Sequence, residues 1–268
     1  MENRKIGFIG GGNMGGALAQ AAIRSLGAEN VLLSDSTPTN TKVLSQNIGA
    51  TPSTHKEIAE TCRLIFIAVK PNVVPAVLEN LKPLLAKRTD NYALVSIAAG
   101  VTVDSILEIV GKDVHVIRMM PNTAVAVGQG MIVFAPHCDD EDVRIFEDAM
   151  AQAGMVSPIN ENLIDAATAV MGCGPAFAYL FIEALADGGV SCGLTRSEAQ
   201  IYAAQMVAGA ANMVLTTGKH PGELKDAVCS PGGSTIRGVR TLEENGFRSA
   251  AIEAVIASFE KTKELGKK

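Results

Sequence analysis

A short apolar strand that leads directly into a glycine-rich turn and then a helix is predicted at residues 5–19. The turn carries Gly10, Gly12 and Gly15 in the spacing G-x-G-x-x-G. In this setting the first glycine permits a tight turn, the second lets the backbone approach a pyrophosphate, and the third lets the helix pack closely on the strand. Because the glycines stand between a strand and a helix, the pattern predicts a Rossmann-type sheet that binds a dinucleotide.

Asp35 ends the second predicted strand and supports this interpretation. It stands about 20 residues beyond Gly15, the spacing at which dinucleotide-binding proteins place an acid that binds a ribose hydroxyl. We therefore expect a nicotinamide cofactor.

Apolar strands alternate with helical stretches through residue 158. Strands are expected at residues 5–9, 31–34, 64–69, 93–98, 114–119 and 131–135. Such alternation indicates an α/β fold with a parallel, doubly wound sheet. The segments 69–71 and 98–100 follow strand ends, at the edge where such sheets bind ligands. We assign residues 1–160 to an NAD(P)-binding Rossmann domain.

Only helices are predicted after residue 160, at residues 163–189, 195–217, 235–244 and 248–265. Thr195 and Glu198 form a capping box at the start of the second of them. The segment 203–211 shows little amphipathic contrast, so it must be buried on most sides. A domain of about 105 residues offers little interior for such a helix. We therefore expect residues 161–268 to form an all-α domain that a second subunit covers, in an obligate homo-oligomer.

Composition and spacing exclude several classes of partner and site. The net charge of −5 and the lack of a Lys/Arg run argue against nucleic acid. The uncharged stretch 166–182 is interrupted by glycine and proline and is shorter than a membrane span of about 20 residues, so no membrane is expected. The five cysteines and four histidines lack metal-ligand spacing, which predicts free thiols and no metal. No signal-peptide pattern is found, so a cytoplasmic location is expected.

A second glycine-rich turn, Ser230-Pro231-Gly232-Gly233-Ser234-Thr235, leads into the helix predicted at residues 235–244. The first N–H groups of a helix have no intrahelical partner and lie at the positive end of the helix dipole, so this turn fits a small anion such as a carboxylate. A serine or threonine here also fits a plain helix N-cap. These residues alone leave both interpretations open.

Several motifs follow one another along the chain in the order of a known family. The most specific is segment 221–243, which reads P-x-x-L-x-x-x-V-C-S-P-G-G-S-T-x-x-G-V-x-x-L-E. Others are F-I-G-x-G-x-M at 8–14, A-V-K-P at 68–71, A-A-G-V at 98–101, R-M-M-P-N-T at 118–123 and G-P-A at 174–176. Through these motifs the chain resembles the pyrroline-5-carboxylate reductase family over essentially its whole length.

This resemblance implies a function and an assembly. The family reduces 1-pyrroline-5-carboxylate to proline with NADPH or NADH, which is the last step of proline biosynthesis. Its members have a Rossmann domain and a helical dimerisation and substrate-binding domain. Their homodimers commonly assemble into homodecamers, and the active site forms where two subunits meet.

The resemblance also implies which residues bind cofactor and substrate. The cofactor phosphates are expected at Ile9, Gly10, Gly11, Gly12, Asn13 and Met14, and the nicotinamide half at Ala68, Val69, Lys70, Pro71, Ile97, Ala98 and Ala99. The substrate contacts carried over are Glu161, Ser234 and Thr235.

The chemistry of a cyclic imine agrees with these assignments. An imine accepts a hydride poorly until its nitrogen is protonated, and the enzyme must also hold the carboxylate. We expect the N–H groups of Gly233, Ser234 and Thr235 to bind the carboxylate. The Thr235 hydroxyl is then expected to hydrogen-bond the ring nitrogen and to supply or relay its proton, which makes it the catalytic residue.

Four positions depart from the family pattern. Cys173 stands where serine is frequent, and we expect it to pack a helix because imine reduction needs no nucleophile. Ala227 stands where some members use asparagine near the substrate, and Ala124 replaces a proline. His55 stands where other members carry asparagine beside the adenosine ribose; it is either a surface residue or faces a 2′-phosphate.

The residues near the ribose leave the choice of cofactor open. Asp35 favours NADH, because its carboxylate binds a free 2′-hydroxyl and repels a 2′-phosphate. Donors for a phosphate are available on Ser34, Ser36, Thr37 and His55. We expect NADPH and NADH both to work.

Two other classes of function, another enzyme of similar architecture and a silent dinucleotide sensor, fit part of this pattern. A different cyclic-imine reductase or a β-hydroxyacid dehydrogenase has a similar architecture, but the latter places a catalytic lysine on its long interdomain helix, and residues 163–189 contain none. A catalytically silent dinucleotide sensor would keep the first glycine turn and lose the second, which is intact here.

Overall fold

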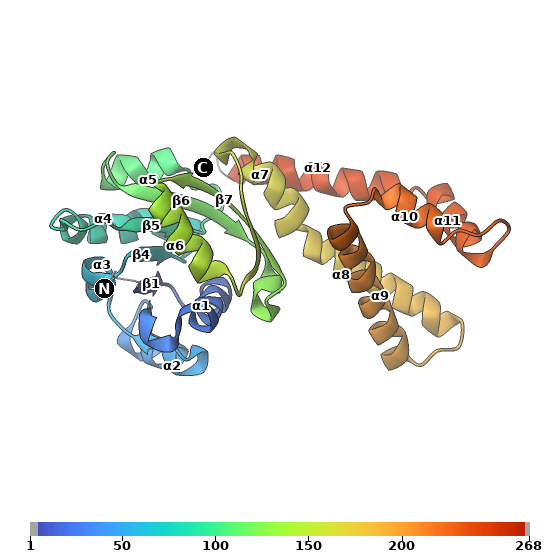
Figure 1. Ribbon diagram of the computed structural model, residues 1–268, viewed down its shortest axis with the longest axis horizontal. Helices are drawn as coiled ribbons and strands as arrows, with labels where there is room; N and C mark the ends of the chain where they lie inside the picture. The colour runs from blue at the N-terminus through green and yellow to red at the C-terminus, as the bar shows by residue number, and fades with distance from the viewer. Residues whose placement is uncertain (1–4, 266–268) are drawn as a thin grey trace. The chain divides into compact units, whose positions relative to one another are not determined.

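The computed structural model describes residues 5–265, which fall into two compact units. The first unit holds residues 5–172 and 259–265, and the second is Cys173–Ser258. In Figure 1 the first unit is a sheet with helices on both faces, coloured from blue to yellow apart from its red residues 259–265, and the second contains only helices.

The first unit is built on one eight-stranded sheet in the order β3-β2-β1-β4-β5-β6-β7-β8. Its strands are β1 (Ile6–Ile9), β2 (Val31–Ser34), β3 (Thr51–Pro52), β4 (Leu64–Ile67), β5 (Ala93–Ser96), β6 (His115–Pro121), β7 (Gly130–His137) and β8 (Gly154–Pro158). The order reverses between β1 and β4, which makes their shared carboxyl edge the switch point of a doubly wound fold. The expected α/β class is therefore confirmed.

One pair of strands corrects the expectation of a fully parallel sheet. All neighbouring strands are parallel except β6 and β7, which are antiparallel. Residues 122–129 join these two strands, and they are too few for a crossover of about a dozen residues, so the chain must turn straight back.

Helices and short turns cover both faces of this sheet (Figure 1). The helices are α1 (Asn13–Leu26), α2 (Pro38–Ile48), α3 (His55–Thr61), α4 (Val74–Leu85), α5 (Val103–Val110), α6 (Asp140–Met150) and α7 (Ile164–Ala167). Between them lie the 3₁₀ turns η1 (Ala28–Asn30), η2 (Pro71–Val73), η3 (Thr123–Val127) and η4 (Glu161–Leu163), and the π-helix η5 (Thr168–Gly172). The side chains of Thr37, Thr54 and Thr102 cap α2, α3 and α5 by accepting backbone N–H groups.

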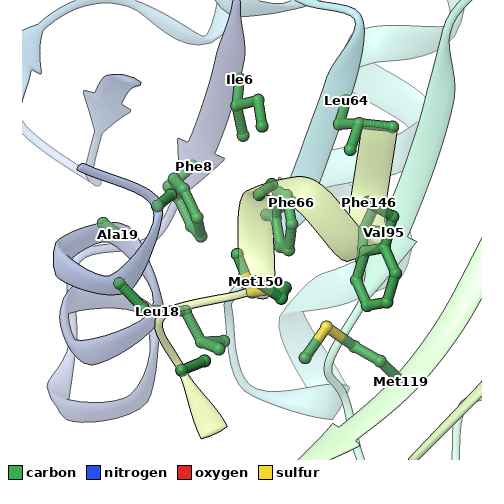
Figure 2. Packing of buried hydrophobic residues seen from close by; sticks show 14 of the residues in the cluster. Ile6, Phe8, Leu18, Ala19, Leu64, Phe66, Val95, Met119, Phe146 and Met150 are labelled. Carbon is green, nitrogen blue, oxygen red and sulfur yellow. The ribbon is translucent and has the colours of Figure 1, made fainter. Parts of the chain in front are cut away.

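The central strands β1, β2, β4 and β5 are buried on both faces, which explains why they are apolar almost throughout rather than alternating. On one face Phe8 and Phe66 stack with ring centroids 4.4 Å apart, and Phe146 of α6 lies against them (Figure 2). On the other face a separate cluster contains Ile65 and Ile67. Each such side chain stabilises the fold by about 1.5–3 kcal/mol through burial.

The second unit consists of α8 (Gly174–Ser191), α9 (Arg196–Thr217), α10 (Pro221–Ala227), α11 (Ser234–Glu244) and the first part of α12 (Phe247–Leu265). The capping box of Thr195 and Glu198 at the start of α9 is confirmed. The helix expected at residues 163–189 is present as the succession of α7, the π-helix η5 and α8, so it is helical throughout but not a regular α-helix.

Large apolar side chains remain exposed on α8 and α9 of this single chain. They include Tyr179, Leu180, Ile201, Tyr202, Met206, Met213 and Leu215. The stretch Glu161–Ser191 has a window with a mean hydropathy of 1.6, of which only 11% is buried. By length and composition it could cross a membrane, although core helices of soluble proteins meet the same criteria. Burial within one chain therefore does not account for these faces.

Candidate active site

The glycine turn between β1 and α1 is held by close backbone packing. Gly10 has a φ of 106°, and a Cβ atom there would collide with the carbonyl oxygen of Ala68. A Cβ atom on Gly15 would collide with the carbonyl oxygen of Gly10 and lie 2.9 Å from the Ala68 Cβ. The turn and packing functions expected of Gly10 and Gly15 are therefore confirmed.

Gly12 differs from these two glycines, because a Cβ atom there would meet nothing within 4 Å. Gly12 is the N-cap of α1 and supplies no side chain to its first N–H groups. Such a helix start, next to open space, fits a phosphate. Gly12 and Asn13 are exposed, so the backbone here is accessible to a pyrophosphate.

The Asp35 carboxylate at the end of β2 is bound to the same turn. Its Oδ2 accepts the Gly11 N–H at 2.9 Å, and its Oδ1 accepts the Ser36 N–H at 2.7 Å. Partial burial by itself raises the pKa of Asp35, but the hydrogen bonds from Gly11, Ser36 and Asn40 together hold this pKa below its ordinary value of 3.8. Asp35 is therefore an anion at neutral pH and is fixed in orientation.

His55, the first residue of α3, is half-buried and is not a plain surface residue. Its Nε2 is buried and has no hydrogen-bond partner among the described residues. Burial lowers the pKa of His55, and the negative charge of Asp35 acts in the opposite direction. An uncharged imidazole with an unpartnered nitrogen near Asp35 is compatible with a ligand at this end of the site.

The loops after β4 and β5 reach the same edge of the sheet as the glycine turn. Ile9 is in register with Ile67, and Ile67 is in register with Ser96. The residues that follow these strand ends are Ala68, Val69, Lys70 and Pro71 after β4, and Ile97, Ala98 and Ala99 after β5. The structure thus brings the expected cofactor residues of three neighbouring strands to one edge.

Glu161, expected as a substrate contact, lies in the first unit and has protein partners. Its Oε1 accepts a hydrogen bond from Arg118 Nη1 at 3.2 Å and from the Val103 N–H at 2.8 Å. Arg118 Nη2 donates to Asp165 Oδ1 at 3.2 Å. Sequence reasoning missed Arg118 and Asp165 as members of this cluster. The available signal was a charged residue inside an apolar strand.

The second glycine turn, in the second unit, leaves the start of α11 without a side-chain cap. The N-cap is Gly233, and its N–H donates to the Ser230 carbonyl at 3.0 Å. Gly232 has a φ of 70°, and a Cβ on Gly233 would collide with the Ser230 Oγ. The helix begins at Ser234, one residue before its expected start.

This geometry excludes the plain N-cap interpretation of Thr235. Thr235 is a residue of the first turn of α11, and both it and Ser234 are exposed. Within residues 5–265 neither hydroxyl has a hydrogen-bond partner. The hydroxyls and the first N–H groups of this helix are therefore available to a ligand.

A cluster at the amino edge of the sheet has the composition of a metal site but is internally paired. His115, Asp139 and Asp142 place their ligand atoms close together. However, Asp142 pairs with His115 Nδ1 at 2.5 Å and with Arg63 Nη2 at 2.7 Å, and Asp139 caps α6. The Arg63 guanidinium already supplies the positive charge that a cation would bring.

Comparison with known families identifies both parts of the chain. The family model described as pyrroline-5-carboxylate reductase dimerisation matches residues 161–265. The family model described as NADP oxidoreductase, coenzyme F420-dependent, matches residues 5–100.

Individual relatives match over the full length. The pyrroline-5-carboxylate reductase of Methanosarcina acetivorans is 42% identical, and the match covers 100% of both chains. That of Escherichia coli is also 42% identical, and the match covers 98% of this chain and 99% of the relative. A crystal structure of the Plasmodium falciparum pyrroline carboxylate reductase with NADP bound has a TM-score of 0.86 at 36% identity, covering 99% of each chain. The reductase of Coxiella burnetii has a TM-score of 0.89 at 30% identity, covering 98% of this chain and 99% of that one. On this full-length similarity in sequence and fold, the chain belongs to the pyrroline-5-carboxylate reductase family.

Proposed function

We propose that this chain reduces the C=N bond of 1-pyrroline-5-carboxylate to L-proline with NADPH or NADH. One observation carries the proposal: the uncapped start of α11, with its free first-turn N–H groups and the Thr235 hydroxyl, in a chain whose other unit has a dinucleotide-binding turn. Relatives named pyrroline-5-carboxylate reductase, 42% identical over nearly the whole chain, support it.

In the first unit we assign the cofactor to the carboxyl edge of β1, β2, β4 and β5. The reduced nicotinamide supplies the hydride when it is bound. The N–H groups at Gly12, Asn13 and Met14 hold the pyrophosphate, and Asp35 accepts from the ribose. The loops at residues 68–71 and 97–99 hold the nicotinamide half. We keep residues 1–160 as the proposed cofactor domain and residues 161–268 as the proposed dimerisation and substrate domain.

In the second unit we assign the substrate carboxylate to the start of α11. The N–H groups of Ser234 and Thr235 bind it with the favourable end of the helix dipole, whereas the Gly233 N–H, also expected to bind it, already donates to the Ser230 carbonyl. The Thr235 hydroxyl hydrogen-bonds the ring nitrogen and supplies or relays its proton, which makes the imine carbon electrophilic. Glu161 remains a proposed substrate residue.

We also propose that the exposed apolar faces of α8 and α9 are covered by a second copy of the chain. A family match described as dimerisation over residues 161–265 supports this oligomer. We further propose that the dimers assemble into a homodecamer. The proposed location is cytoplasmic, with no membrane or nucleic-acid partner. Sedimentation in buffer without detergent measures the assembly directly.

The proposed reaction is tested by following the loss of reduced-nicotinamide absorbance with 1-pyrroline-5-carboxylate, in parallel with NADPH and NADH. Oxidation of either cofactor with matching formation of proline supports the proposal. The six-membered cyclic imine, assayed with reduced cofactor, is the control for another imine reductase. A 3-hydroxy acid, assayed with NADP+ or NAD+ for formation of the reduced cofactor, is the control for a hydroxyacid dehydrogenase. A folded oligomer that binds cofactor but reduces no imine would contradict the proposal and indicate a sensor.

A further inference from the structure

Two buried arginines lie at opposite edges of the sheet, and each pairs with two carboxylates. Arg63 precedes β4 at the amino edge and pairs with Glu141 and Asp142. Arg118 lies in β6 towards the carboxyl edge and is 4% exposed. A buried guanidinium is costly unless it is well paired. Each arginine therefore holds its two carboxylates in fixed positions.

Arg118 stands next to the loop that leaves β5. It is in register with Ser96, the last residue of that strand. Its guanidinium reaches Glu161 Oε1 and Asp165 Oδ1, both at 3.2 Å, on the segment that follows β8. Its Nε is buried and has no hydrogen-bond partner among the described residues. Two of its three nitrogens are therefore used to hold carboxylates in place.

Glu161, which Arg118 holds in place, in turn binds the end of the loop at residues 97–102. The same Oε1 that binds Arg118 accepts the N–H of Val103, the first residue of α5, at 2.8 Å. The loop begins at Ser96, which the sheet holds, and ends at Val103, which Glu161 holds. A carboxylate at a helix start is favoured by the helix dipole. A residue 58 positions further along the chain thus fixes the far end of this loop.

Besides its two ends, the loop is held by the buried side chain of Ala98 and by Val101, which packs on the core cluster that contains Ile65 and Ile67, but its backbone hydrogen bonds are long. Gly100 has a φ of 76°, and the Val101 N–H lies 3.4 Å from the Ala98 carbonyl, which is a long hydrogen bond. The Ala98 N–H lies at a similar 3.4 Å from Ser96 Oγ. Backbone hydrogen bonds therefore position the loop mainly at its two ends.

We infer that Arg118 is a positioning residue for the cofactor. It holds Glu161 on the Val103 N–H and so fixes the 97–102 loop as the surface for the nicotinamide half of the dinucleotide. This inference rests on the proposed placement of that half at the carboxyl edge of β5. Arg118 acts through Glu161, so its loss weakens binding of the nicotinamide half of the cofactor and leaves binding of the adenosine half unchanged.

The test compares two ligands on matched variants. The dissociation constants of NADPH or NADH and of 5′-ADP, which lacks the nicotinamide, are measured on the full oligomer without substrate. The fluorescence of the reduced nicotinamide can be read directly, because it is excited at a wavelength that protein side chains do not absorb. Arg118→Met is expected to weaken reduced-nicotinamide binding by about tenfold and leave 5′-ADP binding unchanged. In turnover, KM for the cofactor should rise more than kcat falls.

Arg63→Met is the matched control, because Arg63 is equally buried and paired but lies at the other edge. It is expected to lower the melting temperature without changing either dissociation constant. Arg118→Lys, which keeps a positive charge, should restore part of the lost nicotinamide affinity and keeps the test valid if Arg118→Met fails to fold. The double variant Arg118→Met with Glu161→Gln should weaken binding little more than Arg118→Met alone, because both changes remove one interaction.

Parallel loss of 5′-ADP and nicotinamide affinity in Arg118→Met would overturn the inference and leave a purely structural arginine. Unchanged affinity for both ligands would also overturn it. Because no imine is present, a chain that fails to reduce 1-pyrroline-5-carboxylate can still show the affinity difference, so the proposed reaction and this inference fail separately.

Discussion

The N–H of Gly11 donates a hydrogen bond of 2.9 Å to the Oδ2 of Asp35, which joins the glycine turn after β1 to the end of β2. The other carboxylate oxygen is bound by the Ser36 N–H. Asp35 therefore has two functions in one place: it holds the turn that carries the pyrophosphate site, and it presents a fixed negative charge where the ribose is proposed to bind.

This fixed charge predicts discrimination against a 2′-phosphate. Two unit charges 4 Å apart in water interact by about 1 kcal/mol, and a phosphate carries up to about two charges. Asp35→Asn should therefore raise the affinity for adenosine 2′,5′-bisphosphate relative to AMP by about tenfold. Calorimetric titration measures both, with Asp113→Asn at the opposite edge as the control. An unchanged ratio would place the ribose elsewhere.

The lowered pKa of Asp35 predicts how its contribution to stability varies with pH. Because the pKa in the folded protein lies below 3.8, the ionised carboxylate stabilises the fold above that pH, and this contribution is lost as the pH falls through the folded pKa. Asp35→Asn should cost about 1 kcal/mol at pH 7 and progressively less below pH 4. Urea unfolding at fixed protein concentration checks this; a cost that grows in acid would contradict it.

The two glycines of the turn should respond differently to the same substitution. Gly15→Ala places a methyl group against the Gly10 carbonyl and should lower the melting temperature together with cofactor affinity. Gly12→Ala meets open space, so its stability should stay near wild type while cofactor affinity falls. Thermal unfolding and cofactor titration separate these effects. Equal destabilisation by both would show that Gly12 is a packing residue as well.

The parts of the fold that could be predicted are those encoded by contiguous residues. Strands such as β1 and β4 are runs of apolar residues buried on both faces, so their positions follow from composition. The strand β3 is two exposed residues long and β8 is only partly buried, so neither has such a signal. In the π-helix η5 the Met171 carbonyl accepts a hydrogen bond from the distant Asn122 Nδ2, a contact that sequence periodicity does not contain.

The candidate site likewise has parts encoded by contiguous residues and parts that depend on contacts between distant residues. The turn around Gly12 and the start of α11 are local motifs, and both were predicted. The cluster of Arg118, Glu161 and Asp165 joins residues more than 40 positions apart, so a single sequence could not assemble it. The expected domain boundary after residue 160 remains a prediction. The first compact unit of the structure runs on to Gly172, whereas the match to the dimerisation family begins at residue 161.

Two thiols should resist alkylation in the folded protein: Cys62, which is buried, and Cys138, which is partly buried. Burial raises the pKa of Cys62 to about 11. Burial and then the charges of Asp142 and Asp139 raise the pKa of Cys138 to about 12. At pH 8 each has at most about one thiolate in a thousand molecules. Iodoacetamide followed by peptide mass spectrometry should label both in urea and neither in buffer; equal labelling in both conditions would contradict these environments.

The Thr235 hydroxyl can be tested without disturbing its helix. Gly233 is the N-cap of α11, so Thr235→Ala removes no cap and the melting temperature should hold. Loss of the proposed proton donor should reduce kcat/KM for the imine by about 100-fold and leave cofactor affinity unchanged. Thr235→Ser keeps the hydroxyl and should recover most of the activity. Thr241→Ala, which removes a hydroxyl bound only to the Arg237 carbonyl of the same helix, is the matched control. If Thr235→Ala turns over within twofold of wild type, the proton must come from solvent or another group, and the start of α11 would then serve only to bind the carboxylate.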